Sequence, residues 1–277
     1  MEEQTYGPPV DRLLTLGGSI ESMDRQPWPD YPARFGLSSE HIPALLRMLA
    51  DPILLDLDYE LPEDDPRIWA VIHAWRALGQ LRAEAAIEPL LGLLITLEDW
   101  DWAIEEVPGV LGMIGPAALV PVTAALTRTA ATGFPAISYA EALKAIADHH
   151  PETRDAVVAA LIAQLDLYPR NDEGLNGFLI AYLVDFKVVK VAPLIEQAFL
   201  AGRVDEMVMG DWEDAQVGLG LLAERQTPRE RPWEEPALPP PPVSASHPLG
   251  RNIERRRKAK RKQARASRRQ NRRRKRR

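Results

Sequence analysis

Apolar residues recur at helical spacing through most of this chain. The first clear case is SSEHIPALLRMLAD, where Ile42, Leu45, Leu46 and Leu49 fall on one face of a helix. Ser38 is placed to act as its N-cap, and a proline follows in or near the first turn, where its missing N–H costs least. The pattern therefore predicts an amphipathic helix that begins close to residue 38.

The same helix, break and helix pattern then returns along the chain. It is seen in residues 73–94, 108–126, 140–165 and 176–202, and a last helix is predicted over residues 211–224. Trp69 and Trp102 are 33 residues apart, as are Gly79 and Gly112. Prolines mark the start of second helices at positions 43, 89, 121 and 193. A period of 32 to 36 residues with two amphipathic helices per period is typical of an α-solenoid, so we expect an all-α fold of about four to five helix pairs.

The segments outside the repeats have a different composition. Residues 1–37 are proline-rich with little periodicity and predict an irregular N-terminal arm, docked by Trp28 and Tyr31. Residues 38–224 form the predicted solenoid. Residues 225–250 are proline-rich, which favours an extended linker, and residues 251–277 form a Lys/Arg-rich tail with nothing to bury, which we expect to be disordered.

Charge divides the chain into two parts of opposite sign. Residues 251–277 hold 17 basic residues and one acid, a net charge of +16, whereas residues 1–250 hold 17 basic and 39 acidic residues, a net charge of −22. Guanidinium groups bind phosphate bidentately, and the tail has no aromatic residue to stack on bases. We expect contact with RNA, the ribosome or another polyanion without sequence specificity. The candidate polyanion-binding residues are Arg255, Arg256, Arg257, Lys258, Lys260, Arg261, Lys262, Arg268, Arg269, Arg272, Arg273, Arg274, Lys275, Arg276 and Arg277.

Three other roles for the tail stay open at this point. It can pair with the acidic body of its own chain, contact an anionic membrane, or act as a nuclear-import signal. The body repels the same polyanions that the tail attracts, so only the tail should touch them.

Two short motifs carry a family resemblance. Ala74 to Gly79 read A-x-x-A-L-G, and Ala85 to Leu91 read A-A-I-x-P-L-L. They resemble HEAT repeats, and more narrowly the short HEAT-like repeats first named from phycobilisome lyases. Residues 35–224 as a whole are similar to a bacterial family of HEAT-like proteins whose members often end in a basic tail. The resemblance implies a protein-binding scaffold, with a lyase-like enzyme or chaperone as the alternative, although residues 101–105 lack the Val-Arg pair that short HEAT-like repeats often carry.

Two acidic-aromatic segments are the most distinctive feature of the body. Each precedes a predicted helix, and together they supply the candidate partner-binding residues Asp99, Trp100, Asp101, Glu105, Glu106, Asp211, Trp212, Glu213 and Asp214. One interpretation is an acidic surface that holds a basic peptide or the protein's own tail. The other is ordinary capping charge, since carboxylates in a first turn favour a helix, with tryptophans packed between repeats. Clustered carboxylates also suit Mg²⁺ or Ca²⁺, but no Asp-x-Asp-x-Asp-Gly loop is present.

Signatures of catalysis are missing from the sequence. There is no Gly-x-Ser-x-Gly, Walker or Gly-x-Gly-x-x-Gly motif, no cysteine, and no histidine spacing that suggests zinc, so we expect structural roles for all five histidines. The longest apolar stretch, about 13 residues, is too short for a bilayer, which needs about 20. No signal peptide is visible. We therefore expect a cytoplasmic, non-enzymatic scaffold that needs no cofactor and binds a protein partner.

Overall fold

A computed structural model describes residues 5–18, 28–55, 61–62, 65–98, 100–131 and 134–228. Every regular element in these ranges is helical, and none is a strand. The chain divides into two compact units, Met1–Thr227 and Pro228–Arg277, and the second has only Pro228 in the described part.

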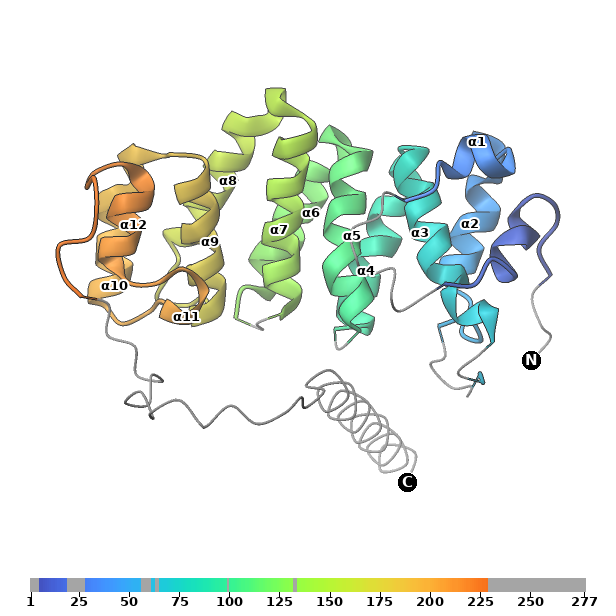
Figure 1. Ribbon diagram of the computed structural model, residues 1–277, viewed down its shortest axis with the longest axis horizontal. Coiled ribbons are helices and arrows are strands. Elements are labelled where there is room, and N and C mark those ends of the chain that lie inside the picture. The colour runs from blue at the N-terminus through green and yellow to red at the C-terminus, as the bar shows by residue number, and fades with distance from the viewer. Residues whose placement is uncertain are drawn as a thin grey trace, which may run out of the picture. The chain divides into compact units, whose positions relative to one another are not determined.

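The helices follow one another with short connections (Figure 1). The α-helices are α1 (Tyr31–Phe35), α2 (Ile42–Leu49), α3 (Ala70–Gln80), α4 (Ile87–Thr96), α5 (Asp101–Ile114), α6 (Leu119–Thr129), α7 (Phe134–His149), α8 (Arg154–Leu165), α9 (Glu173–Asp185), α10 (Ala192–Leu200), α11 (Glu206–Met209) and α12 (Trp212–Leu219). Short 3₁₀ helices are η1 (Val10–Leu14), η3 (Ser39–His41), η4 (Pro66–Trp69), η5 (Glu84–Ala86), η6 (Pro116–Ala118), η7 (Pro151–Thr153) and η8 (Val189–Val191).

Alternate helices pack side by side. Helix α3 packs against α5, α5 against α7, α7 against α9, and α9 against α12, so these helices form a front layer across the unit (Figure 1). The intervening helices α4, α6 and α8 contact one another in the same order. We call α4, α6, α8 and α10 the back layer. The described helices thus pack against their neighbours in two layers.

Each back-layer helix begins with a 3₁₀ turn. The turns η5, η6, η7 and η8 lead directly into α4, α6, α8 and α10. Pro89, Pro121 and Pro193 fall in the first turns of α4, α6 and α10, and Pro43 lies in the first turn of α2. The first N–H groups of a helix have no intrahelical acceptor, so proline there fixes the backbone without losing a hydrogen bond.

Small residues allow the front-layer helices to approach closely. A Cβ atom at Gly112 of α5 would lie 2.7 Å from the Cβ of Ala145 in α7 and 2.8 Å from the Ala145 carbonyl carbon. Any side chain there would push the two helices apart. The rest of the core is mainly leucine and alanine, as expected from the composition of the repeats.

The N-terminal arm contains two short helices, η1 and α1, where the sequence predicts irregular chain. Its apolar side chains Val10 and Leu13 are buried, and Tyr31 is fully buried. The Tyr31 hydroxyl lies 2.7 Å from Nδ1 of His73, and Nε2 of His73 lies 2.8 Å from the Gly17 carbonyl oxygen. The carbonyl can only accept, so Nε2 carries the proton and Nδ1 accepts from Tyr31. The arm therefore docks on α3 through a neutral histidine as well as through apolar contacts.

A buried amide network fixes the chain between α8 and α9. Asn171 donates to the carbonyl of Gln164 at 2.9 Å and to the side-chain oxygen of Asn176 at 2.9 Å. Asn176 in turn donates to the carbonyls of Tyr168 and Arg203, at 3.0 and 2.6 Å. The side chains of Gln164, Asn171 and Asn176 are all buried. The network therefore joins this turn to the segment that follows α10.

In the described part of the chain no single helix has the length and apolar character to cross a membrane. One pair, Asp101–Ile114 with Pro116–Thr129, passes that test together but is bent by 114°.

Candidate functional site

The first acidic-aromatic segment opens α5, and its tryptophans pack into the protein. Trp102 is 8% exposed and meets the ring of Trp69 edge-on, with 5.4 Å between ring centroids. Trp100 meets Trp75 in the same way at 5.5 Å. Both indoles therefore join α5 to the preceding front-layer helix and its leading turn. Asp99 lies outside the described residues.

The Glu106 carboxylate also binds partners within the protein. It accepts from Nε of Arg76 at 2.7 Å and from the indole N–H of Trp75 at 2.9 Å, and it forms a second bond to the Arg76 guanidinium. The two side chains are only 13% and 10% exposed. The same guanidinium lies over the rings of Trp28 and Trp102, at 5.1 and 5.8 Å. Glu106 is thus a structural residue, although the sequence analysis includes it among the candidates for partner binding.

Asp101 and Glu105 remain exposed on α5. Asp101 lies in the first turn, where its charge favours the helix. Glu105 is one of four acidic or phenolic groups that interact across α5, α7 and α9. We call this group the acidic face; its members are Glu105, Glu141, Tyr182 and Asp185.

The electrostatics of the acidic face follow from burial and like charge. Burial raises the pKa of Glu141, the nearby Lys144 ammonium opposes this, and the Glu105 carboxylate adds to the rise. Burial also raises the pKa of the Tyr182 phenol, and the charges of Glu141 and Asp185 raise it further. Lys144 is paired with Asp148 at 2.8 Å. The face therefore carries more negative charge than its own lysine neutralises.

The second acidic-aromatic segment caps α12. The Asp211 carboxylate accepts from the backbone N–H of Asp214 at 3.0 Å, and the Asp214 carboxylate accepts from the backbone N–H of Asp211 at 3.1 Å. This reciprocal arrangement is a capping box, which satisfies two N–H groups that the helix leaves without acceptors. Trp212 packs near Phe199, with 6.3 Å between ring centroids.

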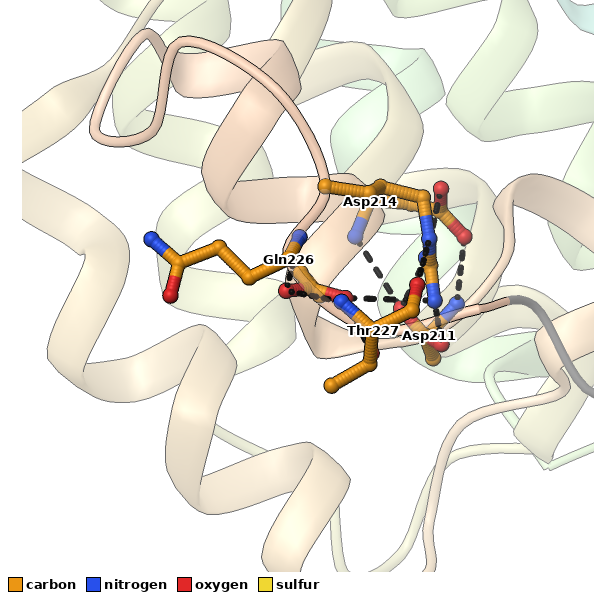
Figure 2. Close-up of polar contacts among 6 residues, drawn as sticks. Asp211, Asp214, Gln226 and Thr227 are labelled. Atoms are coloured by element: carbon orange, nitrogen blue, oxygen red, sulfur yellow. Dashed lines mark hydrogen bonds and ion pairs between the residues drawn. The ribbon is translucent and has the colours of Figure 1, made fainter.

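Residues that follow α12 fold back onto this cap (Figure 2). The Arg225 guanidinium binds Asp211 bidentately at 2.7 and 2.8 Å, and also lies 2.8 Å from Asp214 and 3.3 Å from Glu213. We call the contacts of residues 225–227 with α12 the C-terminal clasp. Arg225 holds the pKa of Asp211 down to about 2, because its hydrogen bonds and charge stabilise the carboxylate.

Glu213 completes the clasp. Its carboxylate accepts from the backbone N–H of Gln226 at 2.7 Å and from the backbone N–H and hydroxyl of Thr227. These hydrogen bonds lower the pKa of Glu213. The described structure thus continues in contact with α12 past residue 224, where the sequence analysis places the start of the linker. The carboxylates of this segment already hold a basic residue of their own chain.

The two acidic-aromatic segments do not meet. Helices α7 and α9 lie between α5 and α12 in the front layer (Figure 1). Of the nine predicted partner-binding residues, Glu105 alone belongs to the acidic face. Glu141, Tyr182 and Asp185 lie in the middle or at the end of their helices, where no acidic-aromatic segment marks them in the sequence. The repeat period offers a signal, since Glu105 and Glu141 are 36 residues apart and Asp148 and Asp185 are 37 apart.

The histidines of the described part do not form a cluster. His41 accepts from the backbone N–H of Ser38 at 3.0 Å, within the capping box of η3, while His149 is the last residue of α7 and His150 follows it. His73 is buried beneath the arm. Among the described residues no group of three or more His, Asp or Glu side chains is placed to hold a metal ion. All fifteen candidate polyanion-binding residues of the tail, and His247, lie outside the described residues.

Comparisons of the chain with protein-family models, with curated proteins and with solved structures gave no match.

Proposed function

We propose that residues 38–224 form a HEAT-like α-solenoid that acts as a non-enzymatic scaffold, with the acidic face as the binding surface for a basic segment of a protein partner. The lysine- and arginine-rich tail adds contact with RNA or another polyanion. The observation that carries the proposal is the closeness of these groups on three successive front-layer helices: Glu105 lies near enough to Glu141 to repel it, and Glu141 and Asp185 both act on the Tyr182 phenol.

Contacts at the repeat period support the solenoid. Trp69 meets Trp102 edge-on, 33 residues later, and Gly112 packs closely against Ala145, again 33 residues later. Gly115 contacts the ring of His150, 35 residues later. Residues that occupy the same place in successive repeats should touch when the repeats stack, because each repeat contacts only its neighbours.

The negative charge left on the acidic face supports a basic partner. Capping, the Arg76 pair and the C-terminal clasp use the carboxylates of Asp214, Glu106 and Glu213 internally. The acidic face keeps carboxylates of like sign close together, and a cationic side chain placed between them relieves that repulsion. The partner chemistry that fits is therefore a lysine- or arginine-containing peptide segment.

The test is binding of a fluorescent basic peptide to the full chain, followed by anisotropy. The triple variant Glu105→Gln, Glu141→Gln, Asp185→Asn should weaken binding about tenfold, since each exposed ion pair contributes about 0.2–1 kcal/mol. A matched control with the same loss of charge is Glu84→Gln, Glu88→Gln, Glu196→Gln, on the back layer and its turns. Equal binding by both triple variants would show that only net charge matters and would contradict the acidic face.

The tail is tested separately with a single-stranded RNA probe. If about eight side chains contact phosphates, log K against log salt should slope near −6, and deletion of residues 251–277 should abolish salt-sensitive binding. RNA binding that survives the deletion would contradict this role. Stronger binding of the basic peptide after the deletion would instead favour the alternative in which the tail occupies the acidic body.

A further inference from the structure

We propose that the N-terminal arm is an acid-sensitive element: when the His73 ring takes up a proton, the arm opens away from α3 while the rest of the helical unit stays folded. The described residues of the arm are 5–18 and 28–37. They lie at the start of the unit and include no member of the acidic face. The proposal therefore does not depend on the proposed function.

One stripe of side chains on α3 and its leading turn holds the arm. The Gln80 side-chain amide accepts from the Tyr31 backbone N–H and donates to the Pro29 carbonyl oxygen, both at 2.8 Å. The Arg76 guanidinium lies 5.1 Å from the centre of the Trp28 ring. The residues of the stripe follow one another at spacings of four, three and four, which places them on one face of the helix. They are Trp69, His73, Arg76 and Gln80.

The arm is a peripheral part of the helical unit. Its two helices pack mainly on α3 and on η4: α1 packs on α3, and η1 packs on both. The Tyr6 hydroxyl adds a bond to the Asp51 carboxylate, at 2.8 Å, just after α2. Opening of the arm therefore leaves the packing among α5, α7, α9 and α12 in place. A peripheral element of this kind opens at a lower free energy than the whole unit unfolds.

The closed arm requires a neutral His73 ring. The ring is 5% exposed, Nδ1 accepts from the Tyr31 hydroxyl at 2.7 Å, and Nε2 donates to the Gly17 carbonyl at 2.8 Å. A second proton would sit on Nδ1 and face the hydrogen of that hydroxyl, which would have to turn away and give up its acceptor. The bond to Gly17 would persist, but the bond to Tyr31 would be lost. Protonation therefore removes a bond that holds the arm closed.

The charges around the ring also oppose a second proton. Among the described residues, the charged groups that act on His73 are the guanidinium groups of Arg76, on its own helix, and Arg34, on α1. The Arg76 guanidinium also bonds the Tyr31 hydroxyl, and the Glu106 carboxylate of α5 is already bound by Arg76. A protonated ring would therefore be a buried cation beside two others. Opening of the arm exposes the ring to water and carries Arg34 away with α1.

The size of the effect follows from the two states of the ring. Burial lowers the pKa of His73 to about 4 while the arm is closed, whereas the open arm returns it to the ordinary value of 6.5. Above pH 6.5 the ring is neutral in both forms, so the opening equilibrium does not change with pH. As the pH falls from 6.5 toward 4 the open form takes up the proton first, so the opening constant should rise about 60-fold between pH 7 and pH 4.5.

Hydrogen exchange of the full chain, followed by mass spectrometry at pH 7 and pH 4.5, measures the opening. The reporters are the backbone amides of Tyr31 and Ala33, which donate to the side chains of Gln80 and Asp30 in the closed arm. After correction for the intrinsic exchange rate at each pH, their protection should fall about 60-fold between the two pH values. The amides of α9, further along the front layer, are the internal reference and should lose much less protection.

Two histidine variants separate the His73 ring from other effects of acid. His73→Asn removes the titration and should abolish the loss of protection in the arm, because the carboxylates near the arm are the same in both chains. His149→Asn, exposed at the end of α7, is the matched control and should behave like the wild-type chain. If His73→Asn leaves the arm unprotected already at pH 7, His73→Gln takes its place.

Three outcomes would overturn the proposal. The first is equal protection of the arm at the two pH values in the wild-type chain. The second is a loss of protection in the His73 variant as large as in the wild type. The third is an equal loss of protection in the arm and in α9, because the whole unit would then unfold at once and the arm would not open by itself.

Discussion

A single carboxylate, that of Glu106, joins α5 to α3 and to the N-terminal arm. It bonds Arg76 and Trp75 of α3, and the Arg76 guanidinium lies in turn over Trp28 of the arm. A buried ion pair of this kind contributes little relative to a well-packed apolar replacement. The two members of the pair nevertheless depend on each other, because removal of one leaves the other charge buried without a partner.

Truncation of Glu106 should therefore cost much more than truncation of its neighbour. Glu106→Ala should lower the free energy of unfolding by about 3–5 kcal/mol, whereas Glu105→Ala, exposed on the same helix, should change it by less than about 0.5 kcal/mol. Urea denaturation measures both. The double variant Arg76→Met, Glu106→Leu should recover most of the loss, and a double variant as unstable as Glu106→Ala would refute the argument.

Protonation of His73 should destabilise the protein in acid. Burial, helped by the charges of Arg76 and Arg34 and opposed by the hydrogen bond to the Gly17 carbonyl, lowers its pKa from the ordinary value of 6.5 to about 4. Above pH 6.5 the ring is neutral in both states. As the pH falls below 6.5 the unfolded chain takes up the proton first, so stability is lost between about 6.5 and 4, by about 2.5 kcal/mol at pH 4.5.

His73→Asn removes this titration. The drop in unfolding free energy between pH 7 and pH 4.5 should be about 2.5 kcal/mol smaller in the variant than in the wild type, while carboxylate contributions cancel in the comparison. Urea denaturation at the two pH values measures it. Equal drops would mean that His73 takes up its proton without cost.

At the scale of elements, α12 depends on residues outside itself. It is short, packs on α9 and α10, and receives the C-terminal clasp at its first turn. Arg225→Ala removes the bidentate contact with Asp211, so amide exchange in α12 should become about tenfold faster. Arg170→Ala, exposed in the turn before α9, should leave exchange in α12 unchanged. Equal effects from both variants would show that the clasp does not secure the helix.

The sequence predicts the long helices well and the short ones poorly. Leu45, Met48 and Leu49 of α2 are buried together at spacings of three and four residues, which a helix but not a strand places on one face, and the first-turn prolines mark the starts of α2, α4, α6 and α10. Helices α1 and α11 have five and four residues, too few to show a period. They are held by side-chain caps from Asp30 and Asp205 and by contacts with distant parts of the chain.

The candidate site was harder to predict, because it too depends on residues that are far apart in the sequence. Whether a carboxylate is free depends on partners far away in sequence: Glu106 is neutralised by Arg76, 30 residues earlier, and Asp211 by Arg225, 14 residues later. Neither pairing follows from local spacing. The acidic face likewise depends on which residues of three separate helices turn to one side, and that information lies in the register between repeats.

At the scale of the whole molecule, the proposed roles fall on distinct parts of the chain. The front layer presents the acidic face, and the tail carries the concentrated positive charge of the sequence. The peptide and RNA measurements therefore report on different parts of the chain. A variant that disturbs one of them without the other would identify the surface that it touches.

The C-terminal clasp also has a mechanical consequence. Any pull on the chain beyond residue 227, for instance by a large polymer held by the tail, reaches Thr227, Gln226 and Arg225 before it reaches the core of the helical unit. Several charge-assisted bonds to α12 share that load, so they must break together or in quick succession before the last helix unravels. The clasp therefore spreads a pulling force over several bonds between residues 225–227 and the first turn of α12.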